Sequence, residues 1–154
     1  MMKLKKRDIN VMNAIIDTNI IIDAIIAREP FKEISQSIIR SVSKKEFNGA
    51  ITTSTITDIY YITNKYLKDK EKTASEIKKL FILFDVIAVT KEDCLKAFDT
   101  GIKDYEDSLL SVCATKWNAD FIVTRNLADF SNSAISVISP EKFLENFSKN
   151  AANP

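Results

Sequence analysis

The sequence contains no histidine. This absence excludes Ser-His-Asp and Cys-His nucleophilic mechanisms, zinc sites with histidine ligands, and histidine as a general base. The two cysteines, Cys94 and Cys113, form no CxxC or Cys/His pattern, so we expect them to be buried, reduced thiols of a cytosolic protein. Any catalysis must therefore use carboxylates, lysine, tyrosine, cysteine or a metal ion held by carboxylates.

Other features are scarce as well. Two glycines and three prolines in 154 residues exclude a disordered or linker-rich chain. Without a GxGxxG motif or a Walker-type phosphate-binding loop, no nucleotide cofactor is expected. No apolar run approaches the roughly 20 residues that span a bilayer. The apolar run behind the basic residues 1–10 contains Asp17 and Asp23, unlike a secretory signal, so we expect a cytoplasmic protein without a membrane segment.

The charges nearly cancel. Twenty-two Lys and Arg residues against 21 Asp and Glu residues give a formal net charge of +1. A strongly basic protein would attract nucleic acid through its overall field. Here, any binding of nucleic acid must depend on local patches.

Short apolar segments alternate with segments of helical periodicity. Strands are expected at 13–16, 86–89, 121–123 and 135–138, with a shorter extended piece at 50–52. Helices are expected at 20–26, 30–47, 53–67, 69–83, 92–100, 105–117 and 140–147, with Asn48 and Gly49 ending the second. This alternation favours a single α/β domain of three layers, with a short, mostly parallel central sheet flanked by helices. Ligands of such sheets bind beyond the carboxyl ends of the strands.

Two aspartates occupy positions that suit a metal ligand. Asp17 directly follows the first expected strand and precedes a helix, although an acid there can also serve as an N-cap. Asp107 ends the run Asp104-Tyr105-Glu106-Asp107, in which Asp104 is a natural N-cap and Asp107 suits a capping box. Three carboxylates in four residues exceed what capping needs, and like charges this close raise one another's pKa unless a cation joins them. The run therefore indicates a bound divalent ion.

Two further acids can complete the site. Asp58 lies about one turn into the helix at 53–67, where an acid beside the core face is more often at the solvent boundary. Asp129 follows the third strand, close to Asn126, where Asn and Asp are also common in turns. Each position alone has a structural explanation. Together they supply hard oxygen ligands without any histidine, a set that selects Mg²⁺ or Mn²⁺ over zinc or copper.

Four segments, in this order, resemble the PIN-domain family of nucleases: 15–19, 53–61, 104–110 and 119–130. The first three carry acids that map to Asp17, Asp58 and Asp107, although many family members have Glu where this chain has Asp58. The fourth carries a polar or acidic position that maps to Asp129 or to Asn126, and we favour Asp129. The resemblance thus covers most of the chain.

The resemblance implies a PIN-like domain at 12–150 and an N-terminal extension at 1–11, which makes Met12 an alternative start to Met1. It implies a metal-dependent endoribonuclease that cleaves single-stranded RNA with Mg²⁺ or Mn²⁺. For a one-domain member of this size, it further implies a VapC-like toxin of a type II toxin–antitoxin pair. Such a protein forms a homodimer and is silenced by a small antitoxin protein.

The mechanism expected from this resemblance is metal-assisted hydrolysis of a phosphodiester bond. Asp17 and Asp107 would hold one ion directly, and Asp58 and Asp129 would bind through water or hold a second ion. Whether one ion or two are bound stays open.

Further side chains would support the acids. Thr18 and Asn126 would orient the carboxylates by hydrogen bonding. Arg125 is either a contact to RNA phosphate or a surface arginine on a loop, and Lys103 is a weaker candidate for the same contact. Glu106 or Asp104 could receive a proton.

Three other classes of protein compete with this interpretation. A PIN-like scaffold that binds RNA or protein with little catalysis is the main alternative, because Asp58 replaces the usual Glu. A receiver-type domain would have paired acids after its first strand, and a phosphatase with an aspartate nucleophile would have Asp-x-Asp there. The sequence has Asp17-Thr18-Asn19 instead, which fits neither pattern.

Overall fold

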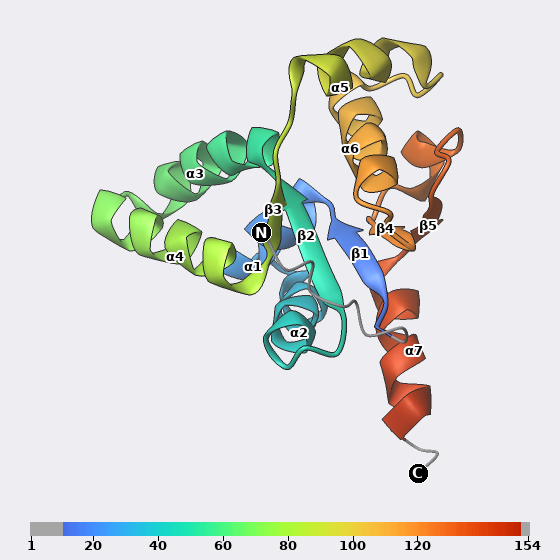
Figure 1. Cartoon of the computed structure of the whole chain (residues 1–154). Coiled ribbons are helices and arrows are strands. Elements are labelled where there is room, and N and C mark those ends of the chain that lie inside the picture. The colour runs from blue at the N-terminus through green and yellow to red at the C-terminus, as the bar shows by residue number, and fades with distance from the viewer. Residues whose placement is uncertain (1–10, 152–154) are drawn as a thin grey trace, which may run out of the picture.

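The central sheet determines where a functional site can lie. In this computed structural model, which describes residues 11–151, five strands pair in parallel in the order β3-β2-β1-β4-β5 (Figure 1). In the middle of the sheet, Ile15 pairs with Ala50 on one side and with Ile122 on the other. The sheet predicted to be mostly parallel is wholly parallel in the described residues. The strands are β1 (Asn13–Ile16), β2 (Asn48–Thr52), β3 (Asp85–Ile87), β4 (Phe121–Val123) and β5 (Ser136–Ile138).

Helices cover both faces of the sheet. They are α1 (Thr18–Ile25), α2 (Lys32–Ser43), α3 (Thr53–Leu67), α4 (Lys70–Leu83), α5 (Lys91–Lys96), α6 (Tyr105–Lys116) and α7 (Pro140–Ala151), with 3₁₀ helices η1 (Ala97–Asp99) and η2 (Leu127–Phe130). Successive strand residues point to opposite faces. Ala14 and Ile16 pack in a core formed with α1 to α4 and α7, whereas Ile15 packs with Leu110 and Cys113 of α6. The predicted three-layer α/β fold is confirmed.

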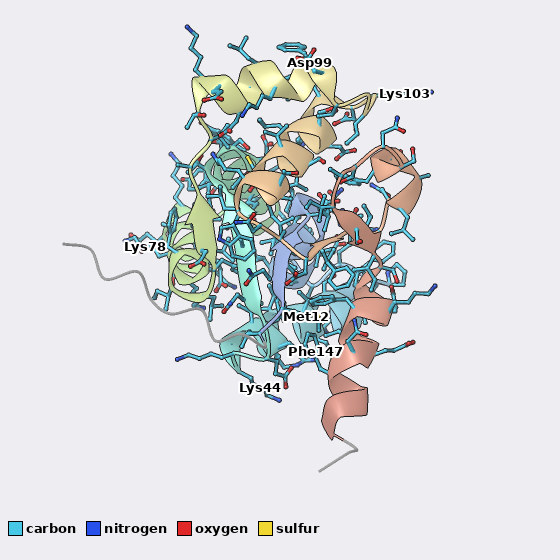
Figure 2. The ribbon with its side chains drawn as sticks, turned by 45° about the vertical axis from the view of Figure 1, so that its right-hand side comes forward. Met12, Lys44, Lys78, Asp99, Lys103 and Phe147 are labelled. Atoms are coloured by element: carbon cyan, nitrogen blue, oxygen red, sulfur yellow. The ribbon has the colours of Figure 1, made fainter. Side chains whose placement is uncertain are left out.

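The order of the strands reverses beside β1. After β3, at one edge of the sheet, the chain crosses to β4 on the other side of β1. The carboxyl ends of β1 and β4 therefore border a topological switch point, where α/β proteins bind ligands. Figure 2 shows Asp99 and Lys103 at one end of the molecule and Met12, which precedes β1, in the other half, near Phe147 and Lys44.

β2 is a full strand beside β1, so the prediction that Asn48 and Gly49 end a helix is wrong. α2 stops earlier, and Lys45 turns the chain with a left-handed φ of 60°. The Asn48 amide then donates to the Met12 carbonyl at 2.9 Å. The chain does turn within a few residues of the predicted helix end. The residue that adopts the left-handed conformation is Lys45, however, and not Gly49.

Gly49 serves packing instead. A Cβ at this position would lie 2.9 Å from the Phe84 ring, which is closer than a methyl group can approach. Glycine therefore lets a buried aromatic ring at the end of α4 pack directly against the sheet.

Several other boundaries differ from the predicted ones by a few residues. α2 begins at Lys32 rather than at Pro30, and α7 continues to Ala151. The helix predicted at 92–100 divides into α5 and η1. Local patterns identify a helix better than they identify its ends.

None of the helices in the described part of the chain has the length and apolarity needed to span a bilayer. The predicted N-terminal extension, residues 1–11, lies outside the described residues except for residue 11. The division of the chain at residue 12 therefore stays a prediction.

Candidate active site

A cavity of about 750 Å³ opens at the switch point. Residues from α1, α3, α6, η2 and the loop before α6 line it. Its acidic lining consists of Asp17, Asp58, Asp104, Glu106, Asp107 and Asp129, and its polar lining of Thr18, Asn19, Asn126, Ser131 and Asn132. All four predicted acids thus line one cavity, although they come from four distant parts of the chain.

Asp17 is a buried acid of the cavity lining. It follows β1 and occupies the N-cap position of α1 with an extended backbone, but its side chain forms no capping hydrogen bond. Instead, its Oδ2 accepts a hydrogen bond from Oγ1 of the fully buried Thr124 at 2.8 Å. Burial raises the pKa of Asp17, against the lowering effects of Thr124, Arg125 and the first amides of α1. Asp17 is therefore a buried carboxylate of the cavity lining, held by Thr124 and by the first amides of α1.

Asp107 lies half-buried in the first turn of α6. The Asp104 side chain caps this helix by accepting a hydrogen bond from the Asp107 amide at 3.1 Å, as predicted. The Asp107 side chain does not return a bond to complete a capping box, so its carboxylate is available to the cavity. Burial, together with the charges of Asp17, Asp104, Asp129 and neighbouring Glu106, raises the pKa of Asp107 to about 7.

Four of the six acids of the cavity are exposed: Asp58, Asp104, Glu106 and Asp129. Burial raises the pKa of Glu106, and the charges of Asp58, Asp104 and Asp17 raise it further. The carboxylates therefore repel one another across the cavity, which is the electrostatic condition that a divalent ion relieves.

No described basic side chain forms an ion pair with these acids. The ion pairs found within residues 11–151 leave out every acid of the cavity. Lys103 is the cation among the described lining residues, and it forms no ion pair there. The negative charge of the site is thus concentrated, and within the described residues no ion pair compensates it.

The donor atoms of the cavity acids suit a hard divalent ion, but the acids lie too far apart to form a compact ligand group. All the acidic donors are carboxylate oxygens, which Mg²⁺ and Mn²⁺ prefer. In the described residues, no three acidic or cysteine side chains are close enough to form a ready-made ligand group. Mg²⁺ usually keeps several water ligands and binds one or two carboxylates directly, so this spacing suits an ion held partly through water.

The fourth position of the predicted site still has two candidates, Asn126 and Asp129. Asn126 and Asp129 both line the cavity and both are exposed. The Asn126 amide donates to Thr124 Oγ1 at 3.1 Å, so this loop is tied to the hydroxyl that bonds Asp17. Asp129 contributes to the raised pKa of Asp107. Thr18 also lines the cavity, beside Asp17.

The structure does not bring Arg125 into the cavity. Its Nη2 lies 2.9 Å from Oδ2 of the fully buried Asp23, and its guanidinium lies 3.7 Å from the centre of the Phe31 ring. Neither interpretation made from the sequence, a phosphate contact or a surface arginine on a loop, describes this inward position. The sequence shows Arg125 beside the site residues but not the acid that turns it away from them.

Thr124 is the site residue that the sequence analysis overlooked. Its hydroxyl connects β4 to Asp17 across 107 positions of sequence. The one available indication was a threonine directly after a short apolar strand, which matters only once β4 is known to pair with β1.

The chain is similar to known proteins in sequence and in fold. The chain matches the family model described as PIN domain over residues 13–128. It is 30% identical over 135 residues to Ribonuclease VapC1 of Aquifex aeolicus, an alignment that covers 84% of this chain and 92% of that protein.

Solved structures resemble it at lower identity. VapBC2 from Rickettsia felis, bound to a DNA fragment from its promoter, gives a TM-score of 0.62 at 19% identity, covering 83% of this chain and 98% of that one. PAE2754 from Pyrobaculum aerophilum gives a TM-score of 0.62 at 14% identity, covering 90% of each chain. The matched family model runs from β1 into η2 and includes three of the four predicted acids, Asp17, Asp58 and Asp107. The chain therefore belongs to the PIN domain family.

Proposed function

We propose that this protein is a metal-dependent endoribonuclease that hydrolyses phosphodiester bonds of single-stranded RNA. The observation that carries the proposal is the cavity at the switch point, whose six acids have no basic partner among the described residues. A curated relative that is named a ribonuclease, at 30% identity over most of both chains, supports the same activity.

Asp17 and Asp107 would hold Mg²⁺ or Mn²⁺ directly. Asp58 and Asp129 would bind through water or hold a second ion, with Asn126 as the alternative to Asp129. The bound ion supplies a lowered pKa for water at the site and compensates charge on the phosphate oxygens. Because the pKa of Asp107 is about 7, an added positive charge would also keep this carboxylate ionised at neutral pH.

The protein's own groups would position the reactants and accept a proton. Thr124 donates to one oxygen of Asp17 at 2.8 Å and would thereby fix the orientation of this carboxylate at the cavity. Glu106, whose pKa is raised, suits the role of a proton acceptor at the cavity rim. Thr18 and Asn126 would orient the carboxylates by hydrogen bonding.

Lys103 is the proposed contact to RNA phosphate. It lines the cavity and has no ion-pair partner among the described residues, whereas Arg125 is engaged with Asp23. A lysine at the rim of an acidic cavity can hold a phosphate that would otherwise be repelled by the carboxylates.

We further propose that the chain is the toxin of a toxin–antitoxin pair and acts as a homodimer. The relative VapC1 and the VapBC2 complex support this assignment by their names. Expression of the wild-type chain should arrest bacterial growth, and co-expression of a small protein from the adjacent reading frame should restore it. Light scattering of the purified chain should give the mass of two copies. Growth arrest by the Asp17→Asn variant would contradict a nuclease toxin.

The nuclease activity is tested with an end-labelled single-stranded RNA in Mg²⁺, in Mn²⁺ and with a chelator. We expect internal cleavage with either ion and none with the chelator. Asp17→Asn should lower the rate by at least about 100-fold. The matched control is Asp85→Asn, which changes an exposed acid on β3 that does not line the cavity and should leave the rate unchanged. Cleavage that persists in the chelator would contradict the metal dependence.

A PIN-like scaffold with little catalysis is the second candidate. The exposed position of Asp58 and the open spacing of the acids favour it. Thermal unfolding with added Mn²⁺ separates the two functions, because an ion that binds the folded state raises Tm by mass action. We expect a rise in Tm for the wild type and a smaller one for Asp17→Asn. A scaffold without a metal site would show neither.

A further inference from the structure

One ion pair joins α1 to the loop after β4, and neither of its side chains lines the cavity. Asp23, in the middle of α1, is fully buried among isoleucines of the core. Its Oδ2 lies 2.9 Å from Nη2 of Arg125, and its Oδ1 lies 3.4 Å from Nη1 of the half-exposed Arg28. The Arg125 guanidinium also lies over the Phe31 ring. Arg125 is thus held from two sides, by charge and by stacking.

The pair connects to the site through neighbouring residues of one loop. Thr124 donates to Asp17, and Asn126 donates its amide to Thr124. Arg125 lies between them and pairs with Asp23, which is about 9 Å along the helix axis from Asp17 at 1.5 Å per residue. The loop therefore holds α1 at two points, one at the catalytic acid and one six residues later.

Stability alone does not account for an ion pair whose aspartate is fully buried and whose arginine is only 23% exposed. Burying two charges costs as much as or more than their attraction returns, and well-packed apolar residues of similar volume often replace such a pair without loss of stability. The two carboxylate oxygens of Asp23 and Nε of Arg125 also complete no hydrogen bond with the described residues. Such a pair is better explained by the geometry that it imposes.

We infer that Asp23 and Arg125 are positioning residues, whose ion pair fixes the loop at 124–126 and so holds Thr124 against Asp17 and Asn126 at the cavity edge. This inference rests on the proposed nuclease function. It assigns the arginine a role behind the site rather than at the RNA phosphate.

The decisive variant replaces the pair with apolar residues, Asp23→Leu with Arg125→Met. We expect Tm to stay at or above the wild-type value, because the replaced pair contributes little net stability. We expect kcat to fall about 10-fold or more, because loss of groups that orient metal ligands typically has an effect of 10- to 100-fold. The KM for RNA should change by less than about 3-fold, because neither side chain lines the cavity.

A second readout does not depend on turnover. The Mn²⁺ concentration that gives half of the maximal rise in Tm should increase in the double variant, because Asp17 loses its fixed orientation. The matched control is Arg28→Met, which removes the longer, more exposed contact to Asp23 and leaves the loop untouched. It should keep the wild-type kcat and Mn²⁺ response.

A double-mutant cycle tests whether the Asp23–Arg125 pair affects kcat through Thr124. If the pair acts through Thr124, then Thr124→Val should lower kcat strongly in the wild type and much less in the Asp23→Leu/Arg125→Met background. If the double variant does not fold, the nearly isosteric Asp23→Asn takes its place in every measurement, with the same expected fall in kcat and the same comparison with Arg28→Met.

The outcomes separate this inference from the function on which it rests. A wild-type chain that cleaves RNA beside a folded double variant with equal kcat and equal Mn²⁺ response would overturn the inference alone. Equal effects of Thr124→Val in both backgrounds would also overturn the proposed route through Thr124. A wild-type chain that cleaves no single-stranded RNA with either ion would overturn the proposed function, and this inference with it.

Discussion

Two helices of this protein begin with similar sequences and have opposite electrostatics. α5 follows Thr90 and has Asp93 as its third residue, and α6 follows Asp104 and has Asp107 as its third residue. Thr90 and Asp93 exchange both bonds of a capping box, whereas Asp107 returns none to Asp104. The capping box is therefore complete at α5, for which the sequence analysis did not consider it, and incomplete at α6, for which it did.

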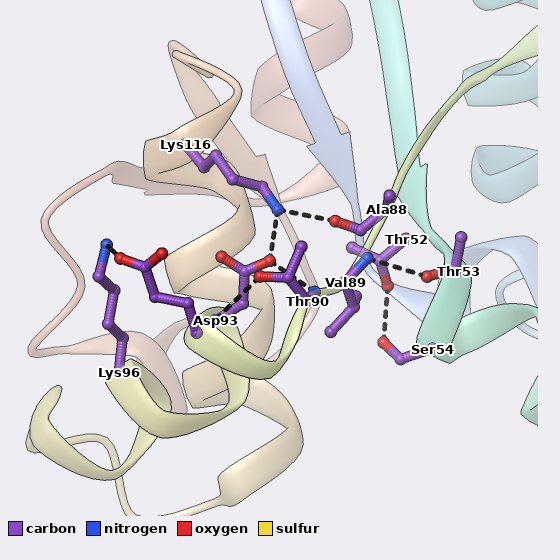
Figure 3. Close-up of polar contacts among 10 residues, drawn as sticks. Thr52, Thr53, Ser54, Ala88, Val89, Thr90, Asp93, Lys96 and Lys116 are labelled. Atoms are coloured by element: carbon purple, nitrogen blue, oxygen red, sulfur yellow. Dashed lines mark hydrogen bonds and ion pairs between the residues drawn. The ribbon is translucent and has the colours of Figure 1, made fainter.

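A lysine accounts for much of the remaining difference. Lys116 reaches from the end of α6 to the Asp93 carboxylate and to the Ala88 carbonyl (Figure 3). Burial acts to raise the pKa of Asp93, but the hydrogen bonds from Lys116 and Thr90 outweigh it and lower the pKa. Asp107 has no such ion-pair partner within residues 11–151, and burial together with neighbouring acids raises its pKa to about 7. A half-buried acid that is unpaired and raised in pKa indicates function, whereas a paired one indicates structure.

Replacing Asp107 should reduce activity, whereas replacing Asp93 should reduce stability. The loss of activity is the largest effect that we expect. Asp107→Asn should reduce RNA cleavage by at least about 100-fold. Its Tm should stay the same or rise, because one of several mutually repelling charges is removed. Gel-based cleavage rates and calorimetry on the same preparation test both parts. Wild-type cleavage by this variant would remove Asp107 from the catalytic set.

Asp93→Asn should show the converse behaviour. The variant weakens a buried, charge-assisted contact, which we expect to lower the free energy of unfolding by about 1–3 kcal/mol. Cleavage per folded molecule should stay within about 2-fold of the wild type, because Asp93 does not line the cavity. Urea unfolding and cleavage assays at low temperature separate the two quantities. A larger loss of activity than of stability would make this network part of the site.

The pH dependence of stability should differ in sign at the two acids. The folded-state pKa of Asp107 is raised, so between about pH 4 and pH 7 the folded state binds more protons there than the unfolded state does. Its contribution therefore destabilises the fold as pH rises through that range. The lowered pKa of Asp93 contributes stability above its unfolded value, and this is lost as pH falls through the folded value.

These signs are checked by measuring Tm from pH 4 to pH 8 for the wild type and for Asp107→Asn. Relative to the variant, the wild type should lose Tm as pH rises toward 7. Added Mn²⁺ should stabilise the wild type several-fold more strongly at pH 8 than at pH 6, because the ion requires an ionised carboxylate. Parallel curves for the two proteins would show that Asp107 titrates normally.

The smallest expected effects compare two lysines. Lys103→Gln should raise KM for RNA by a few-fold, leave kcat unchanged, and reduce the slope of log affinity against log salt by about 1, as expected for one phosphate contact. Lys116→Gln should lower Tm and leave KM unchanged, because its amine is bound to Asp93 and Ala88. An unchanged salt slope in Lys103→Gln would remove Lys103 from the RNA contact.

Local pattern was sufficient for much of the architecture. The short apolar segments at β1, β4 and β5 and the helical periodicity between them predicted a parallel sheet with helices on both faces. β2 was underestimated because Asn48 and Gly49 favour turns locally, while their place in the sheet depends on pairing with β1 and on the Phe84 ring. Pairing between distant segments leaves no trace in a local window.

The sequence by itself determined the chemistry that is possible here: no histidine, an acid after the first strand, and a run of acids before a long helix. Only the tertiary structure decided which groups meet. Thr124 bonds Asp17 across 107 positions of sequence, and Arg125 pairs with Asp23 instead of lining the cavity. Lys116 pairs with Asp93, whereas Asp107 has no ion-pair partner among the described residues. The physical reason is that residue type and spacing act locally along the chain. Burial and charge pairing depend on neighbours that only the folded sheet brings together.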